Sequence, residues 1–245
     1  CPFYRLRQAH PLIVDLSPDF DPCWTDTYMW LATLYDELYY NYEDAEVNTF
    51  RRHRDSEWYG RQGYKYNVLA AEEGYYMAMY RTARYLIDGD VVDKDYDEAY
   101  SWLRKCEDHC NDLPLYWLGN MHYYSQYGRE NRVLARKYYE AYKEKYEEKE
   151  YNKNIITEGY AQTLTNLAHL LLQQESSICD SRARDMLEKV TESSFELADA
   201  LYGYVLYEGK GGMKDRTGGL QYMRKAADRG DLMARQFLRN YGYSV

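Results

Sequence analysis

The sequence predicts an all-α fold, an α/α array of about four to five helical hairpins stacked on one another. Two stretches of the chain, around Gly89 and around Gly209, repeat the same order of small, aromatic, glycine and acidic residues. No stretch sustains the alternation of apolar and polar residues that is typical of a half-buried strand. Repetition at this spacing indicates hairpins that bury their apolar faces only against their neighbours.

The two clearest repeats match position by position. Counted from the loop glycines Gly89 and Gly209, the matched pairs are Ala78 and Ala198, Leu86 and Leu206, Asp95 and Asp215, Trp102 and Tyr222, and Lys105 and Lys225. Weaker repeats are centred on Ser125 and Gln173, and one more lies near His53. The extra length before Gln173 falls in and around the charged run at 143–153.

The helices follow from these repeats and from their stops. Gly74 and Gly230 are predicted to end helices, because glycine tolerates the positive φ found at a helix C-terminus. Alanine at the pairing offsets would let the two helices of a hairpin approach closely. The predicted helices, in order, are 25–42 and 63–73, then the pairs 75–87 with 96–109, 115–126 with 131–149, 156–174 with 181–191, and 195–208 with 218–229, and a short capping helix at 231–239.

The stretch AdalYGyvLyeGkGgmkDrtgglqYmrKAAdrGD, residues 198–231, resembles the Sel-one-like repeat family (SLR), which is related to the tetratricopeptide repeats (TPR). A second match is supplied by Leu86, the run DGDVV at 88–92, Asp95, Ala99 and Trp102. The resemblance covers roughly residues 53–239. It implies a right-handed α/α solenoid of SLR/TPR-like hairpins, in which the first helices line a concave groove that binds other proteins.

The sequence departs from the family pattern at two places. Gly218 and Gly219 replace a Lys-Ala pair, and Val91 replaces the second loop glycine. These departures put the geometry of the loops in question and leave the expected architecture unchanged.

The first residues of the chain predict where in the cell the protein is located. Cys1 at the N-terminus is similar to a bacterial lipoprotein after signal-peptide cleavage, in which the new terminal cysteine carries the lipid. Pro2 stands where an aspartate would retain such a protein at the inner membrane, so the expected site is the periplasmic face of the outer membrane. The alternative is a chain start that merely falls on a cysteine. Residues 1–22, which are rich in proline, read as an extended tether, and residues 23–245 as a single repeat domain.

The remaining cysteines are Cys23, Cys106, Cys110 and Cys179. In an exported protein this even set would allow two disulfides in three connectivities. Cys106 and Cys110 stand four residues apart near a helix end, within reach of a disulfide. A metal site built on them and on His109 would lack a second ligand pair, so no metal is predicted.

The composition of the chain limits the classes of partner that it can bind. A net charge of -9 argues against nucleic acid, and no run approaches the 18 consecutive apolar residues of a membrane-spanning helix. Between Gln8 and Phe50 the chain has no Lys or Arg, and this acidic stretch is either a solvated face or a docking surface for a basic partner. Its acidic residues are Asp15, Asp19, Asp21, Asp26, Asp36, Glu37, Glu43, Asp44 and Glu46.

Tyrosine is unusually common, at 31 of 245 residues, and many tyrosines are adjacent. The pairs are Tyr39 with Tyr40, Tyr75 with Tyr76, Tyr123 with Tyr124, and Tyr138 with Tyr139. Neighbours on a helix point about 100° apart, so one narrow buried stripe cannot hold both. We therefore expect some of these tyrosines to be at least half exposed and to contact a partner.

No catalytic signature is present. The chain lacks a nucleophile elbow, a phosphate loop, a zinc-protease motif and a dinucleotide fingerprint, and we predict neither an enzyme nor a cofactor. The aspartates between Asp88 and Asp97 do not fit a calcium loop, and Asp95 is expected to cap a helix instead. Helical phase places the partner-binding side chains at Tyr35, Tyr39, Tyr80, Arg84, Tyr116, Asn120, Tyr123 and Tyr204.

Three functions remain open. The first is an immunity protein, since lipid-tethered proteins resembling this family neutralise phospholipase effectors of type VI secretion. The second is a scaffold for an envelope machine such as an exopolysaccharide secretin or a flagellar stator, and the third is a host-cell or signalling adaptor. A hydrolase is the enzyme-class alternative, and we expect no turnover.

Overall fold

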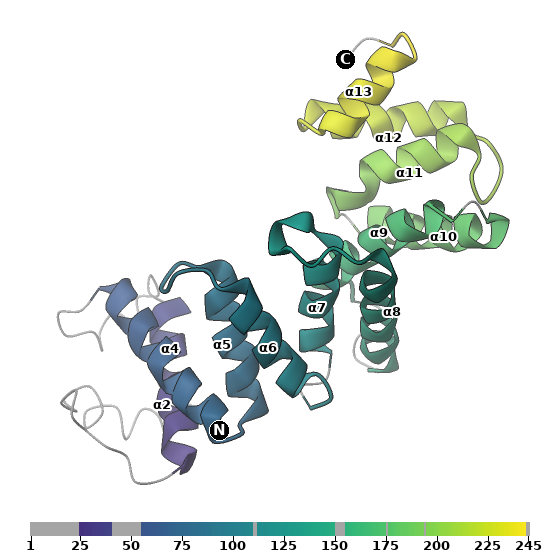
Figure 1. Ribbon diagram of the computed structural model, residues 1–245. Helices are drawn as coiled ribbons and strands as arrows, with labels where there is room; N and C mark the ends of the chain where they lie inside the picture. Colours follow the sequence, from purple (N-terminus) through teal and green to yellow (C-terminus); the bar gives the residue numbers. More distant parts are fainter. Residues whose placement is uncertain are drawn as a thin grey trace. The chain divides into compact units, whose positions relative to one another are not determined.

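The computed structural model describes residues 25–40, 55–109, 112–149, 155–174, 176–193 and 195–243. These residues form helices and loops, and no strand occurs among them, so the predicted all-α fold class is confirmed. They divide into two compact units, one up to Pro114 and one from Leu115 (Figure 1). Within the described ranges, no helix combines the length and the apolar character needed to cross a bilayer.

Each unit is a run of packed helices. The first contains α2 (Thr25–Tyr40), α4 (Ser56–Glu72), α5 (Tyr76–Asp88) and α6 (Tyr96–Cys106). The second contains α7 (Leu113–Tyr123), which begins at the boundary, η1 (Ser125–Tyr127), α8 (Arg132–Glu148), α9 (Glu158–Leu172), α10 (Ser177–Glu192), η3 (Glu196–Ala198), α11 (Asp199–Glu208), α12 (Arg216–Asp228) and α13 (Leu232–Asn240). The prediction of one domain over 23–245 stays a prediction.

The loops confirm the repeat alignment at the level of single hydrogen bonds. Gly89 and Gly209 end α5 and α11 with φ of 72° and 74°, the left-handed region that favours glycine. The residue that caps the second helix of each hairpin donates its backbone N–H to a carbonyl near the end of the first helix. These bonds run from Asp95 to Leu86 (3.1 Å), from Asn131 to His122 (2.8 Å) and from Asp215 to Leu206 (2.9 Å). The weak repeat at Ser125 therefore closes its loop with the same hydrogen bond as the two strong repeats, although the short helix η1 (Ser125–Tyr127) lies within that loop.

The two departures from the repeat pattern have packing explanations. Val91, at the place of a loop glycine, is buried, and its Cγ2 would lie 2.6 Å from a Cβ added to Gly60. Gly219 allows α12 to approach α11, because a Cβ there would lie 2.7 Å from the carbonyl oxygen of Gly203. Glycine replaces the usual alanine where these two helices come closest.

The predicted start of the second helix was wrong. We expected it at residue 63, whereas α4 begins at Ser56, and Asp55 caps it by accepting a hydrogen bond from the backbone N–H of Trp58 (2.9 Å). Gly60 and Gly63 both lie inside the helix and are buried there. Their small size serves packing between helices and does not end α4.

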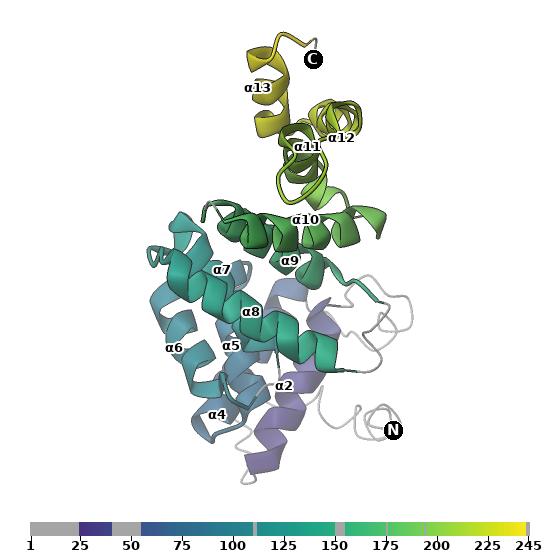
Figure 2. The same ribbon diagram turned by 90° about the vertical axis from the view of Figure 1, so that its right-hand side faces the viewer.

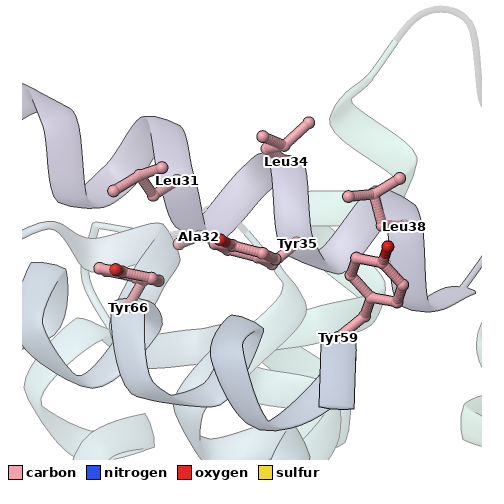
Figure 3. Packing of buried hydrophobic residues seen from close by; sticks show 7 residues of the cluster. All are labelled: Leu31, Ala32, Leu34, Tyr35, Leu38, Tyr59 and Tyr66. Carbon is pink, nitrogen blue, oxygen red and sulfur yellow. The ribbon is translucent and has the colours of Figure 1, made fainter. Parts of the chain in front are cut away.

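Aromatic rings fill the core between α2 and α4. Tyr35 is 7% exposed and stacks on Tyr66, with ring centroids 5.5 Å apart and an interplanar angle of 4°. Figure 3 shows this ring between those of Tyr66 and Tyr59, with Leu31 and Leu38 on the same helix. Flat stacking of large rings lets α2 bury a wide apolar face with few residues.

The tyrosine pairs behave as expected in part. Tyr40 is 61% and Tyr76 40% exposed, whereas Tyr138 and Tyr139 are both buried, which contradicts the expectation for that pair. The reason is that α8 packs against two other helices. Tyr138 stacks on His122 of α7, and Tyr139 accepts a hydrogen bond from Asn166 of α9 at 3.0 Å.

Candidate protein-binding grooves

The first helices of the hairpins in each unit border a groove. In the first unit the groove lies between α2 and α5 and has a volume of about 340 Å³. It is lined by Thr33, Asp36, Glu37, Tyr40, Tyr80, Arg81 and Arg84. Aromatic rings and groups of both charges are therefore combined in one small hollow, a composition suited to contacts with another polypeptide.

Asp36 anchors this groove from its floor. Its carboxylate accepts a hydrogen bond from the hydroxyl of Tyr85 at 2.6 Å and from the side-chain amide of Asn67 at 3.0 Å, and Arg81 lies 3.4 Å away. Burial raises the pKa of Asp36 above its ordinary value, against the opposing effect of these donors. Gly63 makes room for the cluster, since a Cβ there would lie 2.7 Å from the Asp36 carboxylate. Asp36 belonged to the predicted acidic surface, and its burial removes it from that surface.

The two arginines of the groove are held by neighbours. Arg81 donates to the hydroxyl of Thr33 at 2.9 Å, and Arg84 donates to the carboxylate of Asp88 at 2.9 Å. Both guanidinium groups stay partly exposed, with 28% and 33% of their side chains accessible. A positioned and partly exposed arginine loses little conformational entropy when a partner carboxylate or carbonyl binds it.

The second unit has its own groove, of about 430 Å³, at the first helices α9 and α11 and the capping helix α13. Its lining is mostly apolar and comprises His169, Leu172, Gln173, Leu201, Tyr204, Lys210, Met223, Met233, Gln236, Phe237 and Asn240. Tyr204 meets Phe237 edge to face at 6.4 Å, and Lys210 lies over its ring at 5.9 Å. Met233 is 51% exposed at the rim. Flexible methionine beside fixed aromatic rings is suited to an apolar side chain of a partner.

His169 links this groove to α7. Its Nε2 lies 3.1 Å from the amide of Gln173, which donates, so Nδ1 carries the proton and lies 2.6 Å from the hydroxyl of Tyr123. Burial, and secondarily the charge of Arg132, lowers the pKa of His169 below its ordinary value of 6.5. The neutral ring is the form that the fold favours.

We expect this histidine to make the second unit sensitive to acid. A group with a lowered pKa in the folded state contributes full stability above its ordinary pKa and loses it as the pH falls through 6.5 toward the lowered value. Thermal unfolding at about pH 7.5 and about pH 5.5 should therefore show a larger drop for the wild type than for His169→Gln, which cannot be protonated. Equal drops in the two proteins would show that His169 does not carry the effect.

The predicted binding residues fall into three groups. Tyr80 and Arg84 line the groove of the first unit, and Tyr204 lines that of the second. Tyr39 and Tyr116 are half-buried beside other rings, as is Tyr123 beside His169. Tyr35 and Asn120 are buried, at 7% and 4% exposure, so their side chains serve packing. Asn120 accepts a hydrogen bond from the hydroxyl of Tyr139 at 2.8 Å.

Sequence reasoning missed several lining residues. Asp36 and Arg81 come from the same two helices as the predicted residues, and Phe237 and Met233 come from the capping helix. One signal was available for Asp36, because a carboxylate next to Tyr35 within an apolar helix face is unusual unless it is paired.

The remaining sequence predictions concern cysteines and metals. Cys106 is buried, with its sulfur 3.5 Å from the carbonyl oxygen of Leu103, and Cys179 is a half-buried thiol. Cys1, Cys23 and Cys110 lie outside the described residues, so lipidation and the disulfides stay predictions. Within the part of the chain that the structure describes, no group of three or more His, Cys, Asp and Glu side chains is arranged to hold a metal ion.

Comparison with known proteins agrees with the architecture. The model of the Sel1 repeat matches residues 77–105, 115–141 and 195–231, which include the repeats centred on Gly89, Ser125 and Gly209. No curated protein matches the sequence. The matches are confined to these hairpins and say nothing of the partner.

Two crystal structures have a similar fold. One is a protective antigen present in uropathogenic Escherichia coli strains, described as displaying an SLR fold, with a TM-score of 0.62 and 22% identity over 88% of this chain and 42% of that protein. The other is a Sel1 repeat protein from Oxalobacter formigenes, with a TM-score of 0.60 and 16% identity over 96% of this chain and 83% of that protein. The chain therefore spans less than half the length of the Escherichia coli antigen. The likeness shows the fold, an α/α solenoid of the SLR type.

Proposed function

We propose that this chain is a protein-binding repeat protein, without catalytic activity, that holds a partner in the grooves along its first helices. The observation that carries the proposal is the groove between α2 and α5, where exposed tyrosine, positioned arginine and acidic groups meet. Tyrosine and arginine are among the residues that supply most of the energy of protein interfaces. Sel1 repeat proteins are typically non-catalytic scaffolds, which supports the same reading.

The partner that we propose is a secreted toxin, resembling the phospholipase effectors of type VI secretion, which the chain neutralises in the bacterial envelope by covering the active site. Neutralisation demands tight binding, and rigid tyrosine side chains give large contact area at a low cost in entropy. A lipase-like effector encoded beside the gene would support the proposal, which is tested by expressing this chain and such an effector in the same cells. If cells that express the effector survive only when they also express this chain, the immunity function is supported. Lack of protection, together with recovery of the chain in a large multiprotein complex, would favour the scaffold function.

The groove itself is tested by Tyr80→Ala with Arg84→Ala. Loss of a rigid ring and of a positioned guanidinium from the same groove should weaken the complex with the neutralised partner about 30-fold or more. The measurement is the Kd by calorimetry, with circular dichroism to show that helical content is unchanged.

A matched control is Tyr100→Ala with Arg104→Ala. These residues have the same types and spacing but lie on α6, the second helix of the same hairpin. The control should leave the Kd within a factor of about two. If both double variants bind as the wild type does, the partner does not use the groove of the first unit.

A further inference from the structure

The outer face of α8 presents exposed side chains along its whole length. Val133, Lys137, Glu144 and Glu148 are exposed, and Val133 reaches 79%. The opposite face of the helix is buried through Ala135, Tyr138, Tyr139, Tyr142 and Tyr146. Beside the outer face runs a hollow of about 820 Å³ between α8 and the end of α9 (Figure 2 shows both helices).

Charge is segregated along this face. The first half of α8 carries Arg132, Arg136 and Lys137, and the second half carries four glutamates and two lysines, of which Lys143 is paired with Glu147 at 2.6 Å. On the outer face itself, Arg136 and Lys137 of the first half are followed by Glu140, Glu144 and Glu148 of the second. Glu140 is engaged within the chain, by Arg136 at 3.1 Å and by Arg182 at 3.6 Å. Lys137 and Glu144, by contrast, have no ion-pair partner among the described residues.

With respect to the helix dipole, this order of charges does not stabilise α8. The helix dipole places partial positive charge at the N-terminus and partial negative charge at the C-terminus, so acidic residues stabilise the start and basic residues the end. In α8 the first turn has no acidic residue and carries Arg132, while the last turn carries Glu147 and Glu148 beside a single basic residue, Lys145. The reversed order leaves a face with a strong charge gradient, which a partner with the opposite gradient would neutralise.

The charge gradient along the outer face of α8 favours one kind of partner over others. An acidic segment would meet Glu140 and Glu144, and a basic segment would meet Arg136 and Lys137, so neither fits the whole face. A second copy of the same helix, laid antiparallel, sets the acidic half of its outer face against the basic half of the first copy, and its basic half against the acidic half. We propose that α8 is a self-association surface, on which two copies of this chain pair about a two-fold axis.

The spacing of the charges sets the register. Lys137 of one copy lies opposite Glu144 of the other and, by symmetry, Glu144 of the first lies opposite Lys137 of the second. The axis then passes beside Glu140 and Ala141, and the small alanine allows the two helices to approach. Because Arg136 and Arg182 already neutralise Glu140, the two glutamates that meet near the axis repel each other little. A single pair of helices of about 25 Å buries a modest area, so the dimer is weak and salt-sensitive.

Sedimentation equilibrium of the full chain from about 1 μM to about 1 mM tests the pairing. A monomer–dimer equilibrium is expected at low salt, shifted toward monomer at high salt. Lys137→Glu should weaken dimerisation about tenfold or more, because it creates two like-charge contacts, and Glu144→Lys should do the same. The double variant Lys137→Glu with Glu144→Lys exchanges the charges and should restore the dimer.

The control is Arg224→Glu, which changes the net charge as Lys137→Glu does but lies on α12, where Arg224 is exposed. It should dimerise as the wild type does. A wild type that stays monomeric over the whole concentration range at low salt overturns the proposal. So does a dimer that the double variant fails to restore, since charge pairing across α8 would then not hold the copies together.

Discussion

Replacing Asp36 by Ala will lower the free energy of unfolding of the first unit by about 3 kcal/mol. The hydroxyl of Tyr85, the amide of Asn67 and the guanidinium of Arg81 all point at this carboxylate, at 2.6, 3.0 and 3.4 Å, and the first two are buried. Removing the acceptor leaves the buried hydroxyl of Tyr85 without this partner and takes from the buried amide of Asn67 one of its two acceptors, the other being the carbonyl of Gly63. Chemical denaturation followed by tryptophan fluorescence measures the loss, because Trp30 packs against the core of this unit.

Asp36→Asn is the control for shape. It keeps one acceptor oxygen and the volume of the side chain, so it should cost about 1 kcal/mol. Because burial raises the pKa of Asp36 above 3.8, its stabilising contribution is complete below that pH and declines as the pH rises through the raised pKa. The cost of Asp36→Ala should therefore be larger at about pH 3.5 than at about pH 7. A cost below about 1 kcal/mol at both pH values would show that the cluster does not stabilise the unit.

The elements that the sequence predicted well are those governed by local backbone rules. Gly89 and Gly209 end helices because their φ is positive, and Asp95 and Asp215 begin helices because their carboxylates accept backbone N–H bonds at 2.8 and 2.9 Å. Such rules depend on a few consecutive residues. They hold wherever the repeat recurs, including the weak repeat at Ser125, whose sequence signal is faint.

The errors arose where tertiary packing assigns a residue its role. Gly63 was read as a helix boundary, but it lies inside α4, where a Cβ would come within 2.6 Å of the hydroxyl of Tyr85 from another helix. Asp36 was assigned to an acidic surface. It is buried instead, because donors from two other helices, α4 and α5, bind its carboxylate, and these donors lie far from it in the sequence. The contact of Gly63 leaves no mark in the neighbouring sequence, and the sequence around Asp36 indicates a paired carboxylate without indicating its partners.

The candidate site shows the same division. Helical phase found Tyr80, Arg84 and Tyr204, which face the grooves because first helices of successive hairpins are adjacent. It also selected Tyr35 and Asn120, which are buried. An error of one or two residues in a predicted helix start is enough to assign a buried residue to the exposed face. The charge gradient of α8 could have been read from the sequence. Its exposure could not, because burial of both Tyr138 and Tyr139 fixes which face of α8 is outward.

Replacing Gly219 by Ala will destabilise the second unit by about 2 kcal/mol, although alanine favours a helix over glycine by about 1 kcal/mol. A Cβ at this position would lie 2.7 Å from the carbonyl oxygen of Gly203 and 2.8 Å from the backbone nitrogen of Tyr207. Backbone atoms cannot rotate away as a side chain can, so α12 would have to move off α11. Hydrogen exchange should show faster exchange of the amides of both helices, and thermal unfolding should report the lower stability.

Gly159→Ala isolates the steric effect, because Gly159 is also in a helix of this unit, near the start of α9. A Cβ added there would meet no atom closer than 3.7 Å, so the substitution should be neutral or stabilise by up to about 1 kcal/mol. Replacing glycine by alanine would then lower the stability at Gly219 and leave it unchanged or raise it at Gly159. The two positions differ in how close the backbone of the next helix lies. If Gly219→Ala were also neutral, the packing of α12 against α11 would not require glycine at this position. The replacement of the repeat's alanine by Gly219 would then have another cause.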